Sequence, residues 1–174
     1  MKKIIMLPIV ICVALASIYF INATNTDFEK DLGGKHQIKS HKITNNSEDY
    51  AEIQLDLTHS SKDKLKPTIK VLKGDDLVYF GEKKVKDDTL GNYIIELTFT
   101  DTWIQKNGKN QMEKLSKDLQ TAEDKSNRLL NNVKIAYPPD DAMMVLYFGV
   151  SEEPEVNIEE DSDYIKVKLN KKIK

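Results

Sequence analysis

Cysteine is almost missing from this 174-residue chain, and the one present, Cys12, lies inside an apolar run. A single cysteine excludes a disulfide within the chain. A lipid-modified cysteine needs a small residue immediately before it, whereas the bulky Ile11 precedes Cys12. If the chain is cleaved after Ala16 or Ala23, no thiol nucleophile remains, and stability then comes from packing alone.

Arginine is equally scarce, because Arg128 is the only arginine among 26 basic residues. The planar guanidinium is the usual side chain for recognising phosphate and carboxylate, so its scarcity argues against an anion-binding site. The formal net charge is -2, whereas nucleic-acid-binding domains present a basic face. We therefore expect no nucleic-acid partner.

Motifs for catalysis, metals and cofactors are also missing. The three histidines, His36, His41 and His59, show no H-x-x-x-H spacing and have no cysteine beside them. Acidic pairs such as Asp75 and Asp76 do not fit the spaced calcium-binding loop. The chain has neither a G-x-S-x-G motif nor a phosphate-binding glycine loop. We therefore predict a non-enzymatic protein with no catalytic residue, metal site or cofactor.

The first 23 residues are a strongly apolar segment, in which two lysines precede an apolar run over residues 4–21. A positive end followed by apolar residues inserts into a membrane with its lysines on the cytoplasmic side. The run is just long enough to form a hydrophobic helix that spans a bilayer, yet Ala16 and Ala23 are suited to signal-peptide cleavage. Residues 1–23 are therefore a signal peptide or an N-terminal membrane anchor. Either way, the rest of the chain is expected to be extracytoplasmic, secreted or anchored in the cytoplasmic membrane by residues 4–21.

The remaining sequence divides into a polar stretch and a patterned one. Residues 24–49 show no sustained apolar period, so we interpret them as a tether. From residue 50 onward apolar and polar residues alternate in short blocks, as in half-buried strands. Residues 142–150 are apolar at both alternating positions, which predicts a strand buried on two sides. The turn residues 74–76 predict a β-hairpin between residues 68–73 and 77–80.

Over residues 109–131 the spacing of apolar residues changes from every second residue to every third or fourth residue. Met112, Leu115, Leu119 and Leu129 fall on one stripe, which predicts an amphipathic helix packed over the domain's own sheet. A partner-binding or coiled-coil helix is the alternative. The predicted fold is mainly β, antiparallel and sandwich-like, with about seven or eight strands and one amphipathic helix in a single domain over residues 50–174.

Two stretches resemble parts of known families. Residues 90–103, with Leu-Gly-Asn-Tyr, alternating apolar positions and then Trp103, locally resemble a strand of immunoglobulin-like sandwiches. Residues 133–169, with a strand, a proline-rich turn, an apolar strand, Pro-Glu-Val and a final alternating strand, are loosely similar to the last part of wall-targeting amidase N-terminal domains. The first resemblance implies a sandwich strand, and the second implies a location at the cell wall.

Two aromatic residues are candidates for binding. Trp103 closes a strand and is suited to stack on a sugar or a peptide, with packing at the core edge as the alternative. Tyr137 stands beside a rigid diproline that either offers a low-entropy contact point or simply turns the chain. We predict a bacterial envelope protein whose β domain binds a cell-wall polymer or an envelope protein. The alternatives are an inhibitor or immunity-type partner of a secreted enzyme and, from another class, a small cell-wall hydrolase.

Overall fold

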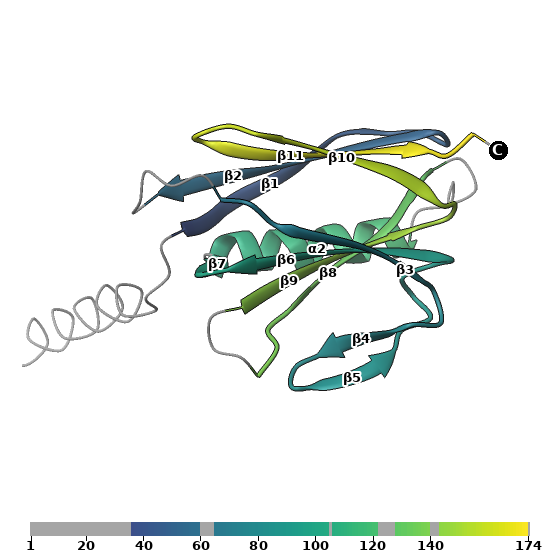
Figure 1. The fold of residues 1–174 in the computed structure, drawn as a ribbon, viewed down its shortest axis with the longest axis horizontal. Coiled ribbons are helices and arrows are strands. Elements are labelled where there is room, and N and C mark those ends of the chain that lie inside the picture. Colours follow the sequence, from purple (N-terminus) through teal and green to yellow (C-terminus); the bar gives the residue numbers. More distant parts are fainter. Residues whose placement is uncertain (1–35, 60–64, 105, 122–127, 140–142, 174) are drawn as a thin grey trace, which may run out of the picture. The chain divides into compact units, whose positions relative to one another are not determined.

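The computed structural model describes residues 36–59, 65–104, 106–121, 128–139 and 143–173 (Figure 1). The strands are β1 (His36–Asn46), β2 (Tyr50–His59), β3 (Thr68–Lys73), β4 (Leu77–Phe80), β5 (Lys83–Lys86), β6 (Tyr93–Thr100), β7 (Thr102–Ile104), β8 (Leu130–Ala136), β9 (Met143–Val150), β10 (Pro154–Glu160) and β11 (Tyr164–Lys171), and the helix α2 is Lys106–Thr121. The predicted signal peptide or anchor, with Cys12, lies outside the described residues. Within the described ranges, no helix is both long and apolar enough to cross a bilayer.

The strands form two larger sheets and a separate hairpin. One sheet has five strands in the order β10-β11-β2-β1-β7, the other has four in the order β3-β6-β9-β8, and β4 pairs with β5. All pairs are antiparallel except β1 with β7, which is parallel over three residue pairs. The mainly β, antiparallel prediction is therefore confirmed, although the described strands outnumber the predicted seven or eight. Strand β5 has a single apolar residue, Val85, and β7 is separated from β6 only by Asp101, so neither gives a strand signal of its own.

The main core lies between the two sheets. Alternate side chains of β2, β6, β9 and β11 meet in one buried cluster that includes Ile53, Phe99, Phe148 and Val167. The other side of β9 contributes Val145 and Tyr147 to a second buried cluster on the outer face of the four-stranded sheet. The predicted burial of this strand on both faces is thus confirmed for residues 143–150.

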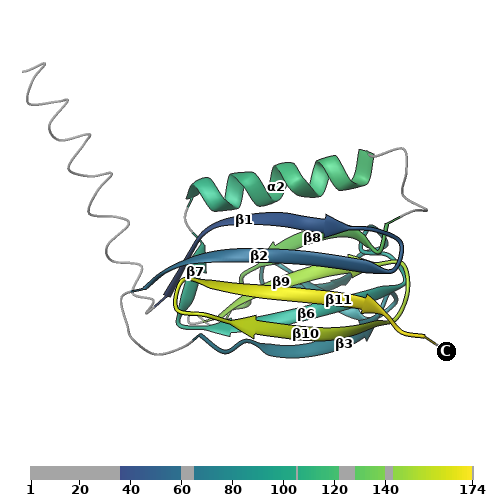
Figure 2. The same ribbon diagram turned by 90° about the horizontal axis from the view of Figure 1, so that it is seen from above.

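Helix α2 runs alongside β1 and β8 (Figure 2). Met112 and Leu119 are buried in the main core and Leu115 packs against it, as the helical stripe predicts. The predicted helix over 109–131 is nevertheless too long at its C-terminal end, because Leu130 already begins β8. Leu129, placed on the helical stripe, is fully buried but reaches the core from the segment just before that strand.

Two further expectations are wrong. The tether predicted at 24–49 is contradicted over residues 36–46, which form β1, a mostly polar strand that pairs antiparallel with β2, while residues 24–35 lie outside the described residues. The predicted hairpin of residues 68–73 with 77–80 does not form either. Strand β3 pairs with β6, and β4 pairs with β5, where Val78 faces Val85. A lone valine among lysines gives a weak strand signal, so β5 is recognised only through its partner.

Candidate functional site

The β4–β5 hairpin covers the outer face of the four-stranded sheet. Val78 of β4 is 2% exposed and belongs to the second buried cluster. The backbone N–H of Tyr79 donates a hydrogen bond of 3.1 Å to the hydroxyl of Tyr147. Burial raises the pKa of Tyr147 to about 12, so this hydroxyl stays protonated at neutral pH. The hairpin is therefore fastened to the sheet by an apolar contact and a buried hydrogen bond.

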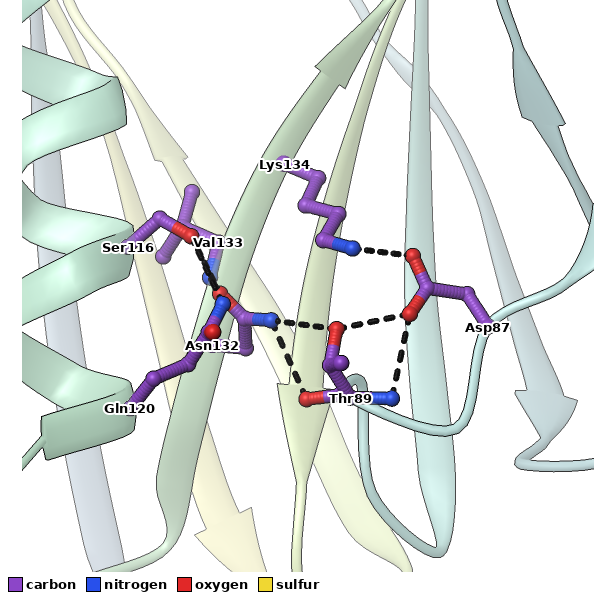
Figure 3. Close-up of polar contacts among 7 residues, drawn as sticks. All are labelled: Asp87, Thr89, Ser116, Gln120, Asn132, Val133 and Lys134. Carbon is purple, nitrogen blue, oxygen red and sulfur yellow. Dashed lines mark hydrogen bonds and ion pairs between the residues drawn. The ribbon is translucent and has the colours of Figure 1, made fainter.

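A buried asparagine joins three elements beside the hairpin (Figure 3). Asn132 of β8 is fully buried, and its amide nitrogen donates to the carbonyl oxygen and the hydroxyl of Thr89, both at 3.0 Å. Its amide oxygen accepts from the hydroxyl of Ser116 in α2 at 2.7 Å and from the backbone N–H of Val133 at 2.8 Å. Every hydrogen-bonding position of this side chain is thus occupied, as buried polar groups require.

Asp87, in the loop after the hairpin, extends the same network. Its carboxylate accepts from the hydroxyl of Thr89 at 2.6 Å and from the backbone N–H of Thr89 at 3.0 Å, and it forms an ion pair with Lys134 of β8. Burial raises the pKa of Asp87, but the hydrogen bonds from Lys134 and Thr89 outweigh burial and hold the pKa below its ordinary value. The carboxylate is therefore ionised and fully engaged with its neighbours.

A groove with a volume of about 380 Å³ lies between the hairpin, α2 and β8. Its apolar wall includes Val78, Tyr79, Phe80, Met112 and Ile135. Its polar lining includes Asp87, Ser116, Gln120 and Lys134, which are drawn in Figure 3, together with Lys109, Glu113 and Lys117 of α2. Phe80 ends β4 and is 73% exposed. The next residue, Gly81, has a φ of 59°, a left-handed conformation that glycine adopts without steric cost. The turn therefore presents a large aromatic side chain to solvent at the rim of the groove.

The sequence-predicted aromatic residues lie elsewhere. Trp103 is half-buried in β7, where it is aligned with Gln37 of β1. Tyr137 follows β8 and is 39% exposed. Burial raises its pKa, while a hydrogen bond with the backbone of Ile104 acts in the opposite direction. The structure therefore places Tyr137 beside the backbone of Ile104, the residue that follows Trp103. Neither Trp103 nor Tyr137 is among the described residues that line the groove.

The histidines occupy the two long N-terminal strands. His36 is 5% exposed in β1, and His59 ends β2. His41 is half-buried, and its Nδ1 atom has no hydrogen-bond partner among the described residues. Across the part of the chain that the structure describes, no group of three or more His, Cys, Asp or Glu side chains is placed to hold a metal ion.

Sequence reasoning missed Phe80 and Asn132. The signal for Phe80 was the large aromatic residue directly before Gly81 at a turn. No sequence signal indicated Asn132, because its partners Thr89 and Ser116 are 43 and 16 residues away in the chain. The chain matches no protein-family model, and searches of the curated proteins and of the solved structures found no match. The candidate site therefore depends on the geometry alone.

Proposed function

We propose that this protein is a non-enzymatic, extracytoplasmic module of the bacterial envelope that binds another envelope protein through the groove beside the β4–β5 hairpin. The single observation that carries this proposal is the 73% exposure of Phe80 next to an apolar groove. Exposed aromatic side chains on a fixed scaffold are typical anchors of protein interfaces. Residues 1–23 support the proposed location, because a charged end followed by an apolar run directs a chain to the membrane.

The state of the polar groups favours a protein partner over a cell-wall polymer. A polysaccharide needs hydrogen-bonding groups that are available to its hydroxyls. Here Asp87, Ser116 and Lys134, which line the groove, already use polar atoms on protein neighbours, and displacing those neighbours would leave polar groups unsatisfied. The lining also includes the exposed Lys109 and Glu113 of α2, and the apolar wall beside Phe80 is suited to an apolar side chain of a partner.

The charge around the hairpin narrows the chemistry of the partner. Strand β5 carries Lys83, Lys84 and Lys86, all exposed. Lys84 lies 4.9 Å from the centre of the Tyr79 ring, and Lys86 pairs with Asp88 at 2.9 Å. A partner segment with an apolar residue flanked by acidic residues would meet both the groove and these lysines.

The test is co-isolation from envelope fractions with matched variants. The wild type and Trp103→Ala are expected to retain the same envelope protein, whereas Phe80→Ala is expected to lose it. Purified peptidoglycan should not sediment the wild type. Sedimentation that depends on Trp103 would overturn the proposal in favour of wall binding, and loss of turbidity in a cell-wall suspension would establish a hydrolase instead.

A further inference from the structure

The edge of the sandwich opposite α2 is formed by β3 of one sheet and β10 of the other, which are the outermost strands there (Figure 2). Ile69 and Val71 of β3 are aligned with Leu97 and Ile95, which belong to the main core. Both side chains therefore face the interior of the sandwich, yet they are 39% and 46% exposed. The core is open along this edge.

Strand β10 has the same apolar character on its inner face. Val156 and Ile158 are aligned with Leu169 and Val167 of the core and are themselves only partly buried. Both strands are thus the last in their sheets within the part of the chain that the structure describes, and both carry inward-facing apolar side chains. Such an edge is a template for pairing with another strand.

The outward-facing side chains of the two edges have opposite charges. Lys70 of β3 is exposed and forms an ion pair with Glu96, opposite it on β6, at 3.2 Å. On β10, Glu155 and Glu159 are exposed, and Glu159 forms an ion pair with Lys168 of β11 at 2.8 Å. A basic edge and an acidic edge on the same side of one molecule are complementary to the same side of a second copy.

We propose that the protein forms a two-fold homodimer in which β3 of each copy pairs with β10 of the other. A two-fold axis parallel to the strands exchanges the two layers, so the four-stranded sheet of one copy continues into the five-stranded sheet of its partner. In this arrangement the core-facing sides of β3 and of the partner's β10 point the same way, so the apolar residues of one strand lie beside those of the other. The interface is closed and self-complementary, as a dimer requires.

The strand directions agree with this arrangement. Asn46, at the end of β1, bonds the backbone of Leu130 at the start of β8, so these two strands run in opposite directions. Following the antiparallel pairs across each sheet, β3 and β10 also run in opposite directions. A two-fold axis along the strands preserves direction, and the new pair is therefore antiparallel.

The axis also fixes which residues meet. Lys73 and Glu152 line the same polar pocket at one end of the open edge, so they lie at similar heights along the strands. Rotation about an axis along the strands keeps these heights, which places Lys70 of one copy near Glu155 of the other. A two-fold axis perpendicular to the layers would instead pair β3 with β3 and set lysines against lysines, an arrangement that like-charge repulsion disfavours.

The test is the mass of the full chain in a density-matched non-ionic detergent, measured by sedimentation equilibrium for four variants. The wild type is expected to be a dimer. Lys70→Glu and Glu155→Lys alone should each weaken the dimer by about tenfold or more, because each creates like-charge contacts at both symmetric positions. The double variant should restore the dimer. Lys114→Glu on α2 makes the same charge change at the opposite edge and should have no effect.

Three results would overturn the proposal. These are a monomeric wild type, a dimer insensitive to Lys70→Glu and Glu155→Lys, and a dimer lost in both single variants but not restored in the double variant. Thermal unfolding of each variant establishes that it is folded, and the double variant decides the matter even if one single variant is unstable. Because the groove lies away from this edge, failure here leaves the proposed envelope partner untouched.

Discussion

Along one edge of the sandwich, α2 covers the flank of β1 and β8, and Met112 and Leu119 are buried. Along the opposite edge, no helix of the described residues lies beside β3 and β10 (Figure 2), and Val71 is 46% exposed although it faces the core. The first edge is closed by apolar packing and by the network around Asn132, whereas the second ends in lysines and glutamates. The two edges of this fold therefore differ: apolar packing covers the core at the first, whereas Ile69 and Val71 leave it partly exposed at the second, where we propose that a second copy binds.

The largest expected difference in stability is between variants in which one apolar side chain is shortened, either at the closed edge or at the open edge. Met112→Ala should lower the free energy of unfolding by about 3 kcal/mol, because it leaves a cavity under α2. Val71→Ala should cost less than about 1 kcal/mol in dilute solution, because the side chain is already half in water. Urea unfolding followed by the fluorescence of Trp103, the only tryptophan, measures both. Equal costs would show that the two edges are equally closed.

The next effect concerns the polar network at the closed edge. Asn132→Ala should lower the free energy of unfolding by about 2 kcal/mol, because the polar groups of Thr89 and Ser116 lose a buried partner. Asn157→Ala on the exposed side of β10 makes the same chemical change and should cost less than about 0.5 kcal/mol. If both substitutions have the same effect, the network does not contribute to the closed edge.

The pH dependence of stability tests the ion pair of that network. The pKa of Asp87 in the folded state is below its ordinary value of 3.8, so its contribution is complete above that value and is lost as the pH falls through the folded-state pKa. Asp87→Asn should remove about 1 kcal/mol at neutral pH and flatten the acid part of the stability curve. If the stability of the variant falls at acidic pH as steeply as that of the wild type, other carboxylates cause the fall.

The smallest expected effect belongs to His41. Burial lowers its pKa below 6.5 in the folded state, against the attraction of Asp56. The unfolded chain therefore binds the proton more readily, and stability declines as the pH falls from 6.5 towards the folded-state pKa. His41→Gln should remove this part of the pH dependence. Stability curves of the variant and the wild type with the same slope in that range would contradict the assignment.

The sequence predicted the strands whose apolar residues follow a clear period. Alternation identified β2, β6 and β11, and the doubly apolar run at 143–150 identified the strand buried on both faces. Strand β1 was missed because only Ile38 and Ile43 are apolar among its residues, so its extended form depends on pairing with β2. The end of the predicted helix was misplaced because Leu129 continues the helical spacing, although it lies directly before β8, which begins at Leu130.

The candidate site was less accessible to sequence reasoning. Trp103 and Tyr137 were singled out by residue type, but contact with a groove depends on which elements meet in space. The groove forms where β4, α2 and β8 come together, and these elements are far apart in the chain. The pairing of β4 with β5 was not predicted, so the exposed position of Phe80 at that turn was also missed.

The central claim is that the groove between the β4–β5 hairpin, α2 and β8, and not the exposed face of β1, meets an envelope protein outside the cytoplasm. The most direct measurement is photo-cross-linking in intact cells, with a benzophenone amino acid in place of Phe80 and, as the control, in place of the exposed Lys42 of β1. The account predicts a covalent adduct with an envelope protein from position 80 and none from position 42. The absence of an adduct at position 80, or equal labelling at both positions, would contradict it.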